Sequence, residues 1–301
     1  MPFAQANGIE LAYEATGVAE APALLLIMGV GAPLTFWPDP FVEGLAARGF
    51  RVVRFDNRDF GLSTKFDGAP ADVQGAYLKL MRGEKIDAPY GLPDMARDAV
   101  GLLDALAIGK AHIVGASMGG MIAQIVAADH AERVRSLVSI MSTSGDPNLP
   151  QGKPEALAVL TAPPPPPEDR AANIEHGLKC QRAIGSLTLP ASDADLRAKV
   201  AAGYDRSNYY AGVPRQLLAV LANGSRVPLL KRITAPTLVI HGTEDPLIPP
   251  EGGKDVAAHI KGAELLLLDG MGHDFPASLI GTLVEAIATH CRKADAAARA
   301  E

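Results

Sequence analysis

The sequence has few cysteines and no long apolar run, and both scarcities limit what the protein can be. Cys180 and Cys291 are the only two cysteines among 301 residues, too few for a disulfide framework, so we expect a reducing, cytoplasmic setting. The apolar run at residues 24–28 is far too short to span a bilayer and is typical of a buried strand. The first residues lack a basic region followed by an apolar stretch, so neither a signal peptide nor membrane insertion is expected.

Clusters of positive charge and metal-binding motifs are also missing. The net charge is −6 and no group of Lys and Arg stands out, which argues against nucleic acid or an anionic membrane as a partner. The seven histidines form no His-Glu-x-x-His pattern, so neither a metal nor an organic cofactor is expected. The sequence shows no internal repeat, and its length suits one large domain or a domain with an insertion. It leaves the oligomeric state open.

Short apolar runs alternate with helical patterns along most of the chain. Asn7-Gly8 predicts a hairpin turn, because both residues accept a positive φ. Apolar runs that do not alternate with polar residues indicate strands buried on both faces, and helices between them favour a parallel sheet. The predicted fold class is therefore α/β, with a mostly parallel twisted sheet flanked by helices. Strands are expected at residues 23–28, 51–56, 112–115, 134–141, 236–241 and 265–268, and helices at 41–47, 93–106, 118–130, 256–260 and 279–292.

Residues 146–229 interrupt this alternation and contain no convincing buried strand. They include five consecutive prolines at 163–167, expected to form a stiff polyproline spacer, with binding to a proline-reading partner as the alternative. Polar helical patterns follow the prolines. We therefore predict a core of residues 1–145 and 230–301, with residues 146–229 as a helical cap insertion over the carboxyl edge of the sheet.

The predicted cap supplies candidates for the roof of a substrate pocket, because pockets form where elements meet and are lined by apolar and aromatic groups. The alternative is that these side chains are only the core of a small helical cap, which must bury something to hold together. The candidates are Tyr204, Tyr209, Tyr210, Leu217 and Leu218.

One serine lies where a strand is predicted to become a helix. Residues 115–119, Gly-Ala-Ser-Met-Gly, fit the pattern G-x-S-x-G, in which glycines flank the serine because side chains would collide in so sharp a turn. The free N–H groups at the helix start supply positive potential where an oxyanion forms. The pattern predicts Ser117 as a nucleophile; a tight turn with an incidental serine is the alternative.

A serine nucleophile needs a base, and candidates for the base and its partner acid each follow a predicted strand. Asp245 lies behind the strand that ends near residue 241, and His273 lies behind the next strand. The carboxyl ends of parallel strands share one edge of a sheet, where such folds place their sites. The order serine, acid, histidine is that of α/β-hydrolases. We therefore predict Ser117, Asp245 and His273 as the catalytic residues.

Neighbouring side chains compete for two of these roles. Glu244 is the rival acid and Asp274 a weaker one. An Asp before Pro, such as Asp245, is often only a turn residue. His241 is interpreted as a residue at a strand end rather than as the base.

The loop after the first predicted buried strand is the candidate for an oxyanion hole. It reads Met-Gly-Val-Gly-Ala-Pro over residues 28–33, and its glycines allow the backbone to approach a substrate. The backbone N–H groups of Val30 and Met118 are the predicted donors, with a glycine-rich loop of no function as the alternative. The candidate substrate-binding residues are Gly29, Trp37, Tyr209, Tyr210 and Leu247.

Over nearly its whole length the sequence resembles α/β-hydrolase-fold serine hydrolases, and within them the aclacinomycin methylesterase-like esterases. The motifs that carry the resemblance lie at residues 28–31 with Trp37-Pro38, 54–63, 115–120, 241–249 and 270–276.

Met28 departs from the family pattern, and residues 56–63 follow it. Many relatives have a histidine before the first glycine of the oxyanion loop, where this chain has Met28, and this difference affects the hydrogen bonding of the loop. Residues 56–63 resemble the D-x-R-x-x-G-x-S turn of the superfamily. We interpret that turn as structural, with Asp56 and Arg58 bracing the loop.

The resemblance implies a carboxylic-ester hydrolase that acts on a small ester, such as a methyl ester of a bulky acid, through an acyl-enzyme. Ser117 cannot perform the alkyl-ester chemistry of relatives that use an aspartate. A carbon–carbon bond hydrolase or enol-lactonase with the same three residues is an alternative, and a small-molecule binding protein on a hydrolase scaffold is another. The carbon–carbon hydrolases need polar groups for a dienolate or second carboxylate, for which the insertion offers Arg182, Arg206 and Arg215.

Overall fold

In the computed structural model, which describes residues 1–300, eight strands form one sheet. Its order is β1-β2-β4-β3-β5-β6-β7-β8, and within the run β4-β3-β5-β6-β7-β8 every pair of adjacent strands is parallel. At the other edge β2 pairs antiparallel with both β1 and β4. The predicted mostly parallel sheet is confirmed. The strands are Phe3–Ala6 (β1), Ile9–Thr16 (β2), Ala23–Ile27 (β3), Arg51–Phe55 (β4), Ala111–Ala116 (β5), Val134–Ile140 (β6), Thr237–Gly242 (β7) and Glu264–Leu268 (β8).

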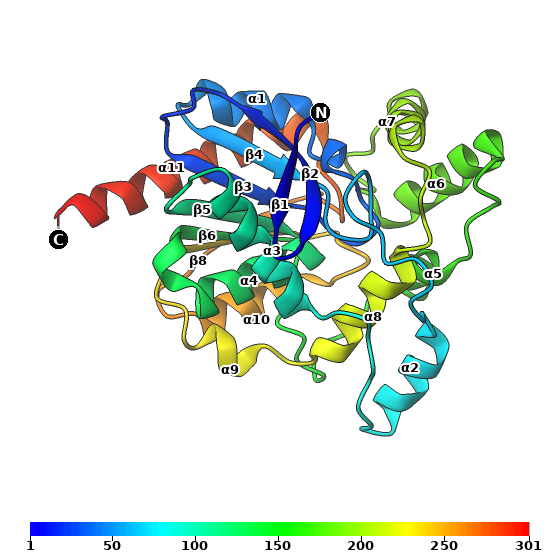
Figure 1. Cartoon of the computed structure of the whole chain (residues 1–301). Coiled ribbons are helices and arrows are strands. Elements are labelled where there is room, and N and C mark those ends of the chain that lie inside the picture. Colours follow the sequence, from blue (N-terminus) through cyan, green and yellow to red (C-terminus); the bar gives the residue numbers. More distant parts are fainter. Residues whose placement is uncertain (301) are drawn as a thin grey trace.

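Helices cover both faces of the sheet (Figure 1). α1 and α11 bury their apolar sides on one face, and α3, α4 and α10 bury theirs on the other. β3 and β5 lie between these layers and are buried along their whole length, as their unbroken apolar runs predict. None of the helices in residues 1–300 combines the length and the apolar character that a membrane span needs. The helices are Asp39–Ala47 (α1), Leu92–Ala105 (α3), Met118–Asp129 (α4), Pro250–His259 (α10) and Ile280–Ala300 (α11).

Two local predictions can be compared with the structure directly. The hairpin between β1 and β2 turns at Asn7 and Gly8, with φ values of 51° and 78°, as expected for a turn that needs left-handed residues. The expectation that the leucine run at 265–268 is buried on both faces is wrong. β8 is an edge strand that helices cover only in part, and Leu265 and Leu267 are 40% and 37% exposed.

Between β6 and β7 the chain forms helices and no strand, and all of residues 146–229 lie in the described range. Figure 1 shows α5 to α8 on one side of the sheet, together with α2, which the sequence did not predict. α6 packs against α5 and α7, and α8 packs against α2 and α3. These helices are Val73–Met81 (α2), Pro154–Thr161 (α5), Arg170–Ile184 (α6), Asp193–Arg206 (α7), Val213–Asn223 (α8) and Val227–Leu230 (α9).

Candidate active site

Ser117 lies in a strained turn between β5 and α4. Its φ of 56° and ψ of −122° are a conformation that a non-glycine residue adopts only when the surroundings enforce it. Its N–H donates to the Ile140 carbonyl at 3.0 Å, and its carbonyl accepts from the Ser142 hydroxyl at 2.9 Å. The flanking glycines are sterically required. A Cβ on Gly115 would lie 2.0 Å from the Gly119 oxygen, and a Cβ on Gly119 would lie 1.9 Å from the Ile27 oxygen.

Gly119→Ala is expected to destabilise the fold by about 3 kcal/mol or more, because the added methyl meets main-chain atoms of β3 that cannot rotate away. Gly281→Ala is the matched control, since a Cβ there meets nothing within 4 Å and alanine favours a helix by about 0.5–1 kcal/mol. Urea unfolding of both variants measures the difference. Equal stability for the two variants would show that the turn does not need a glycine at 119.

Asp245 and His273 meet at the carboxyl ends of β7 and β8. The Asp245 carboxylate accepts from His273 Nδ1 at 2.8 Å and from the N–H groups of Leu247 and Ile248, each at 2.9 Å. His273 is itself held by its N–H, which donates to the Ile184 carbonyl at 2.8 Å. An ionised carboxylate can accept a hydrogen bond but cannot donate one, so the proton between Asp245 and His273 is assigned to Nδ1. Nε2 of His273 is then the free acceptor.

The environment of Asp245 keeps its carboxylate ionised. Burial alone raises the pKa of this group, but the imidazole of His273 and the hydrogen bonds from His241 and His273 lower its pKa to about 2. Asp245 therefore carries its charge throughout the neutral range. A fixed negative charge beside the imidazole is what stabilises an imidazolium during proton transfer.

Ser117 and His273 line the same cavity. Among the described residues, however, the Ser117 hydroxyl forms no hydrogen bond with His273. Contacts of this kind are often long in enzymes without substrate and shorten when the substrate binds.

The two other candidate acids, Glu244 and Asp274, accept hydrogen bonds from residues other than His273. Glu244 accepts from the N–H of Thr188 at 3.0 Å and from the hydroxyl of the same residue. Asp274 accepts from the N–H and hydroxyl of Ser186, at 3.2 and 2.5 Å. His241 is fully buried at the end of β7; its Nε2 lies 2.8 Å from the Ile248 carbonyl and 3.4 Å from Asp245 Oδ2. The geometry thus favours Asp245 as the partner of His273.

The loop after β3 lies directly beside Ser117. A Cβ on Gly29 would lie 3.1 Å from the Ser117 Cβ, so the loop backbone approaches the serine closely. Within the described residues, the N–H groups of Val30 and Met118 have no hydrogen-bond acceptor and are free to donate to a ligand. At Met28 the loop is held through the backbone, because Asn57 Nδ2 donates to the Met28 carbonyl at 2.8 Å.

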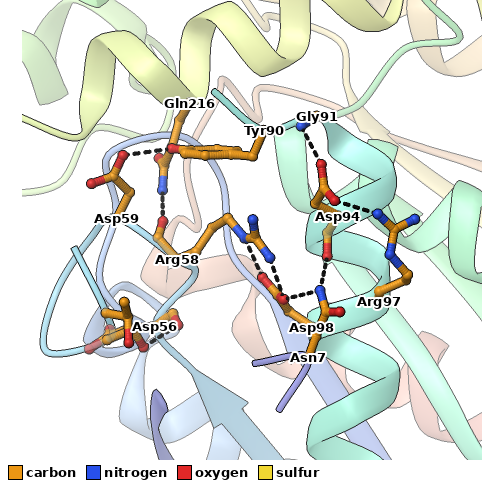
Figure 2. Close-up of polar contacts among 12 residues, drawn as sticks. Asn7, Asp56, Arg58, Asp59, Tyr90, Gly91, Asp94, Arg97, Asp98 and Gln216 are labelled. Atoms are coloured by element: carbon orange, nitrogen blue, oxygen red, sulfur yellow. Dashed lines mark hydrogen bonds and ion pairs between the residues drawn. The ribbon is translucent and has the colours of Figure 1, made fainter. Parts of the chain in front are cut away.

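Gln216 holds this loop from the other side, and sequence reasoning missed it. The side chain is fully buried on α8; its Oε1 accepts from the Gly31 N–H at 2.9 Å and its Nε2 donates to the Arg58 carbonyl at 2.8 Å. Arg58 donates twice to Asp98, both at 2.6 Å, and Asn7 Nδ2 donates to the same carboxylate at 2.9 Å (Figure 2). The loop beside Ser117 is therefore connected through α8 to the polar interior of the core.

Gln216→Leu is expected to lower kcat about 10-fold with a smaller change in KM, because unpaired buried partners at Gly31 and Arg58 cost about 1–3 kcal/mol each and let the loop shift. Gln216→Glu keeps the acceptor for the Gly31 N–H and should retain more activity than the leucine variant. Gln151→Leu, at an exposed glutamine of the same segment, is the matched control. An unchanged kcat in the Gln216→Leu variant would show that the loop holds its position without this side chain.

Buried carboxylates hold the turn at residues 56–63. The sequence interpretation gave this role to Asp56 and Arg58, and Asp59 contributes as well. Asp56 accepts from the N–H groups of Leu34 and Leu62, each at 2.8 Å, and pairs with Arg206 at 2.7 Å. Asp59 accepts from the Tyr90 hydroxyl at 2.9 Å (Figure 2). It also forms an ion pair of 2.5 Å with Arg215 of α8, which lowers the pKa of Asp59 against the opposing effect of burial.

A cavity of about 520 Å³ opens above Ser117 and is walled mainly by apolar groups. Gly29, Val30, Tyr210 and Leu247 line it, together with Tyr204 and Leu217 of the predicted roof. Helices α5 to α8 contribute a large share of the walls. Within the segment 146–229, the residues that line the cavity are Val159, Leu160, Thr161, Ala162, Pro163, Pro164, His176, Gly177, Cys180, Gln181, Ile184, Lys199, Val200, Gly203, Tyr204, Ser207, Tyr210, Val213, Pro214 and Leu217.

Three of the residues predicted to bind substrate or to form the roof of the pocket do not line the cavity. Trp37 is fully buried in the core, with its ring 5.3 Å from that of Phe41, and does not line the cavity. Tyr209 turns away and donates from its hydroxyl to Asp67 at 2.6 Å, and Leu218 packs in a small cluster on the far side of α8. Successive residues point in different directions, so Tyr210 and Leu217 face the cavity while their neighbours do not.

No group of three or more side chains that could hold a metal ion occurs among the described residues. Two pairs of side chains that can supply a nucleophile and a base line the cavity, Ser117 with His273 and Cys180 with His176. Burial raises the pKa of the Cys180 thiol, which disfavours the thiolate, whereas His273 has the Asp245 carboxylate behind its imidazole.

A parallel sheet with a strained serine turn and a buried histidine–carboxylate pair at one edge defines the class of α/β hydrolases. Comparison with known proteins agrees: the chain belongs to the alpha/beta hydrolase fold family, whose model matches residues 22–276. It is 30% identical over 299 residues to rhodomycin D methylesterase DauP of Streptomyces sp. (strain C5), with 92% of each chain covered. The predicted resemblance to methylesterases is confirmed.

Solved structures show the same fold. The enol-lactonase from Burkholderia xenovorans LB400 matches with a TM-score of 0.73 and 24% identity, covering 96% of this chain and 99% of that one. The meta-cleavage product hydrolase from Pseudomonas fluorescens IP01 matches with a TM-score of 0.78 and 20% identity, covering 98% of each chain. At these identities the likeness concerns the fold alone.

Proposed function

We propose that the protein is a carboxylic-ester hydrolase with Ser117 as nucleophile, His273 as general base and Asp245 as the orienting acid. The observation that carries the proposal is the 2.8 Å hydrogen bond from His273 Nδ1 to Asp245, beside a cavity that Ser117 also lines. The relatives named as methylesterases support the same activity.

The reaction follows from these roles. His273 Nε2 takes the proton of the Ser117 hydroxyl as its oxygen attacks the ester carbonyl, and Asp245 stabilises the imidazolium. The N–H groups of Val30 and Met118 donate to the oxyanion of the tetrahedral intermediate. His273 then returns the proton to the departing alcohol, leaving an acyl-enzyme on Ser117. A water molecule, deprotonated by His273, releases the acid and restores the serine.

The substrate we propose is a small-alcohol ester of a bulky acid. A cavity of about 520 Å³ is within the usual range for sites that enclose a small molecule, about 300–1,000 Å³. Residues 146–229 act in this proposal as a cap on a core of residues 1–145 and 230–301, since their helices supply much of the cavity wall. The free thiols of Cys180 and Cys291 support the proposed cytoplasmic location.

The three arginines that the sequence offered to a carbon–carbon hydrolase are not available at the cavity. Arg206 and Arg215 pair with Asp56 and Asp59, and Arg182 pairs with Asp193. None of the three arginines lines the cavity.

A substrate panel tests the proposed function. It contains p-nitrophenyl acetate, methyl esters of acids of graded size, and a dienolic diketone. We expect turnover of the esters, with methyl esters of larger acids preferred, and slower or no cleavage of the diketone. Faster cleavage of the diketone than of every ester would favour the carbon–carbon reaction. Binding of the esters without turnover would favour a binding protein.

A further inference from the structure

One cation lines the cavity and has no carboxylate partner. Lys199 of α7 is half-buried in the wall, where its ammonium lies 4.3 Å from the centre of the Phe36 ring. Among the described lining residues, the only side chains with a permanent charge at neutral pH are Lys199 and Asp274. The remaining wall is mainly apolar, so this ammonium stands out as a polar feature of the cavity.

The contacts of Lys199 leave its charge uncompensated. Its Nζ donates to Gln181 Oε1 at 3.3 Å, and no carboxylate among the described residues lies within ion-pair distance. Asp274 is the nearby acid, but it already accepts two hydrogen bonds from Ser186. Arg206 and Arg215 of the same segment differ from Lys199, because each pairs with a core carboxylate.

Holding an unpaired ammonium against apolar walls costs free energy that an aliphatic side chain would not. Burial lowers the pKa of Lys199 to about 8, and the charge of Asp274 opposes that shift. The group is thus still mainly protonated at pH 7. An unpaired cation in a closed site is compensated when a ligand brings the missing negative charge, through a charge-assisted hydrogen bond.

We propose that Lys199 binds an ionised carboxylate of the substrate at a point remote from the ester that Ser117 attacks. The preferred substrates are then half-esters, in which one carboxyl group of a dicarboxylic acid is esterified and the other is free. This inference deepens the proposed function and rests on it wherever turnover is measured. Lys199 is the specificity-determining residue in this assignment, and Gln181 orients its ammonium.

Matched pairs of esters test the assignment. Each monomethyl ester of a linear C4 to C10 dicarboxylic acid is compared with the methyl ester in which a methyl group replaces the free carboxylate. We expect wild type to favour the half-ester at one or more chain lengths. Lys199→Met should lower kcat/KM for that half-ester about 10-fold or more, the loss expected for one charged hydrogen bond of about 1.5–3 kcal/mol. The neutral ester should be unaffected or improved.

Two further variants separate charge recognition from a packing defect. Lys199→Arg keeps the cation and should retain most of the preference for the half-ester. Lys179→Met removes a positive charge from an exposed position on α6 and should leave the preference unchanged. A Lys199→Met variant that loses activity equally on charged and neutral esters, or a wild type without preference at any length, would overturn the assignment.

The pH dependence of the same ratio gives a second readout. Because the pKa of Lys199 is about 8, its charge is present below that value and is lost above it. The ratio of kcat/KM for half-ester over neutral ester should therefore fall as the pH rises from 7 to 9. The other ionisable groups that line the cavity are Asp274 and His273 from the loop after β8, His176 and Cys180 from α6, Tyr204 from α7, and Tyr210. Effects of His273 on the chemistry cancel in the ratio. A ratio that stays constant over this range would contradict the role of Lys199.

Failure of this inference can be told apart from failure of the proposed function. Ser117→Ala protein binds an ester without consuming it, so calorimetry with the intact half-ester measures recognition alone. Tighter binding of the half-ester than of its neutral partner, abolished when Lys199→Met is added, supports the inference even if wild type hydrolyses no ester. Equal binding of both esters overturns it even if wild type is an active esterase.

Discussion

Ser117→Ala is expected to abolish nearly all ester hydrolysis, with a loss on the order of 10⁴-fold or more, while the fold remains intact. The reason lies in how the turn is held. The contacts of Ser117 with β6 and Ser142 use its backbone N–H and carbonyl, which alanine keeps. The lost hydroxyl is the proposed nucleophile, so the chemistry alone should suffer.

The measurement is kcat/KM on a methyl ester, together with the thermal midpoint of each protein. Ser207→Ala is the matched control, because this serine also lines the cavity and its hydroxyl donates to the Gly61 carbonyl. We expect the control to keep activity within a few-fold of wild type. A Ser117→Ala variant that retains a tenth of the wild-type rate would remove this serine from the mechanism.

Asp245→Asn is expected to lower kcat by about 10³- to 10⁴-fold, somewhat less than His273→Ala. An amide cannot stabilise the imidazolium, and its NH₂ group competes for the position that now accepts from His273 Nδ1. Glu244→Gln is the matched control one residue away, and it should be mild because Glu244 contacts Thr188 instead. If Glu244→Gln lowered kcat more than Asp245→Asn does, Glu244 rather than Asp245 would be the acid that partners His273.

Asp245→Asn should also change how the free energy of unfolding depends on pH. The pKa of Asp245 is lowered from its ordinary value of 3.8 to about 2, so its ionised form stabilises the folded protein above about pH 4. That contribution is lost as the pH falls toward 2. Wild type should therefore lose stability more steeply than the Asp245→Asn variant over this acid range in urea unfolding. Parallel curves would show that Asp245 is not preferentially ionised in the fold.

The sheet could be predicted because its strands are buried on both faces and appear as unbroken apolar runs. β5 was expected at 112–115 and spans Ala111–Ala116, so the ends differ by one residue. β8 has an equally apolar run but lies at the sheet edge, which composition does not reveal. α2 was missed because it packs on α8 rather than on the core sheet, and its pattern is correspondingly weak.

The positions of Ser117, Asp245 and His273 were predictable because each follows a strand end, and the fold brings strand ends together. Gln216 and Lys199 were not predictable in this way. They project from helices of residues 146–229, and which side of such a helix faces the cavity depends on how it docks. Leu217 and Leu218 were both predicted to form the roof, but only Leu217 lines the cavity. The cause is the same, since neighbouring helical residues differ in direction by about 100°.

Covalent labelling tests the central claim most directly. The protein is treated with a neutral phosphonate ester, which reacts with activated serines, and the modified peptide is identified by mass spectrometry while residual hydrolysis of a methyl ester is followed. The account predicts one adduct, on Ser117, in proportion to the activity lost, and no adduct on Ser142 or Ser207. Full loss of activity with the adduct on another residue, or full adduct on Ser117 with activity retained, would contradict it.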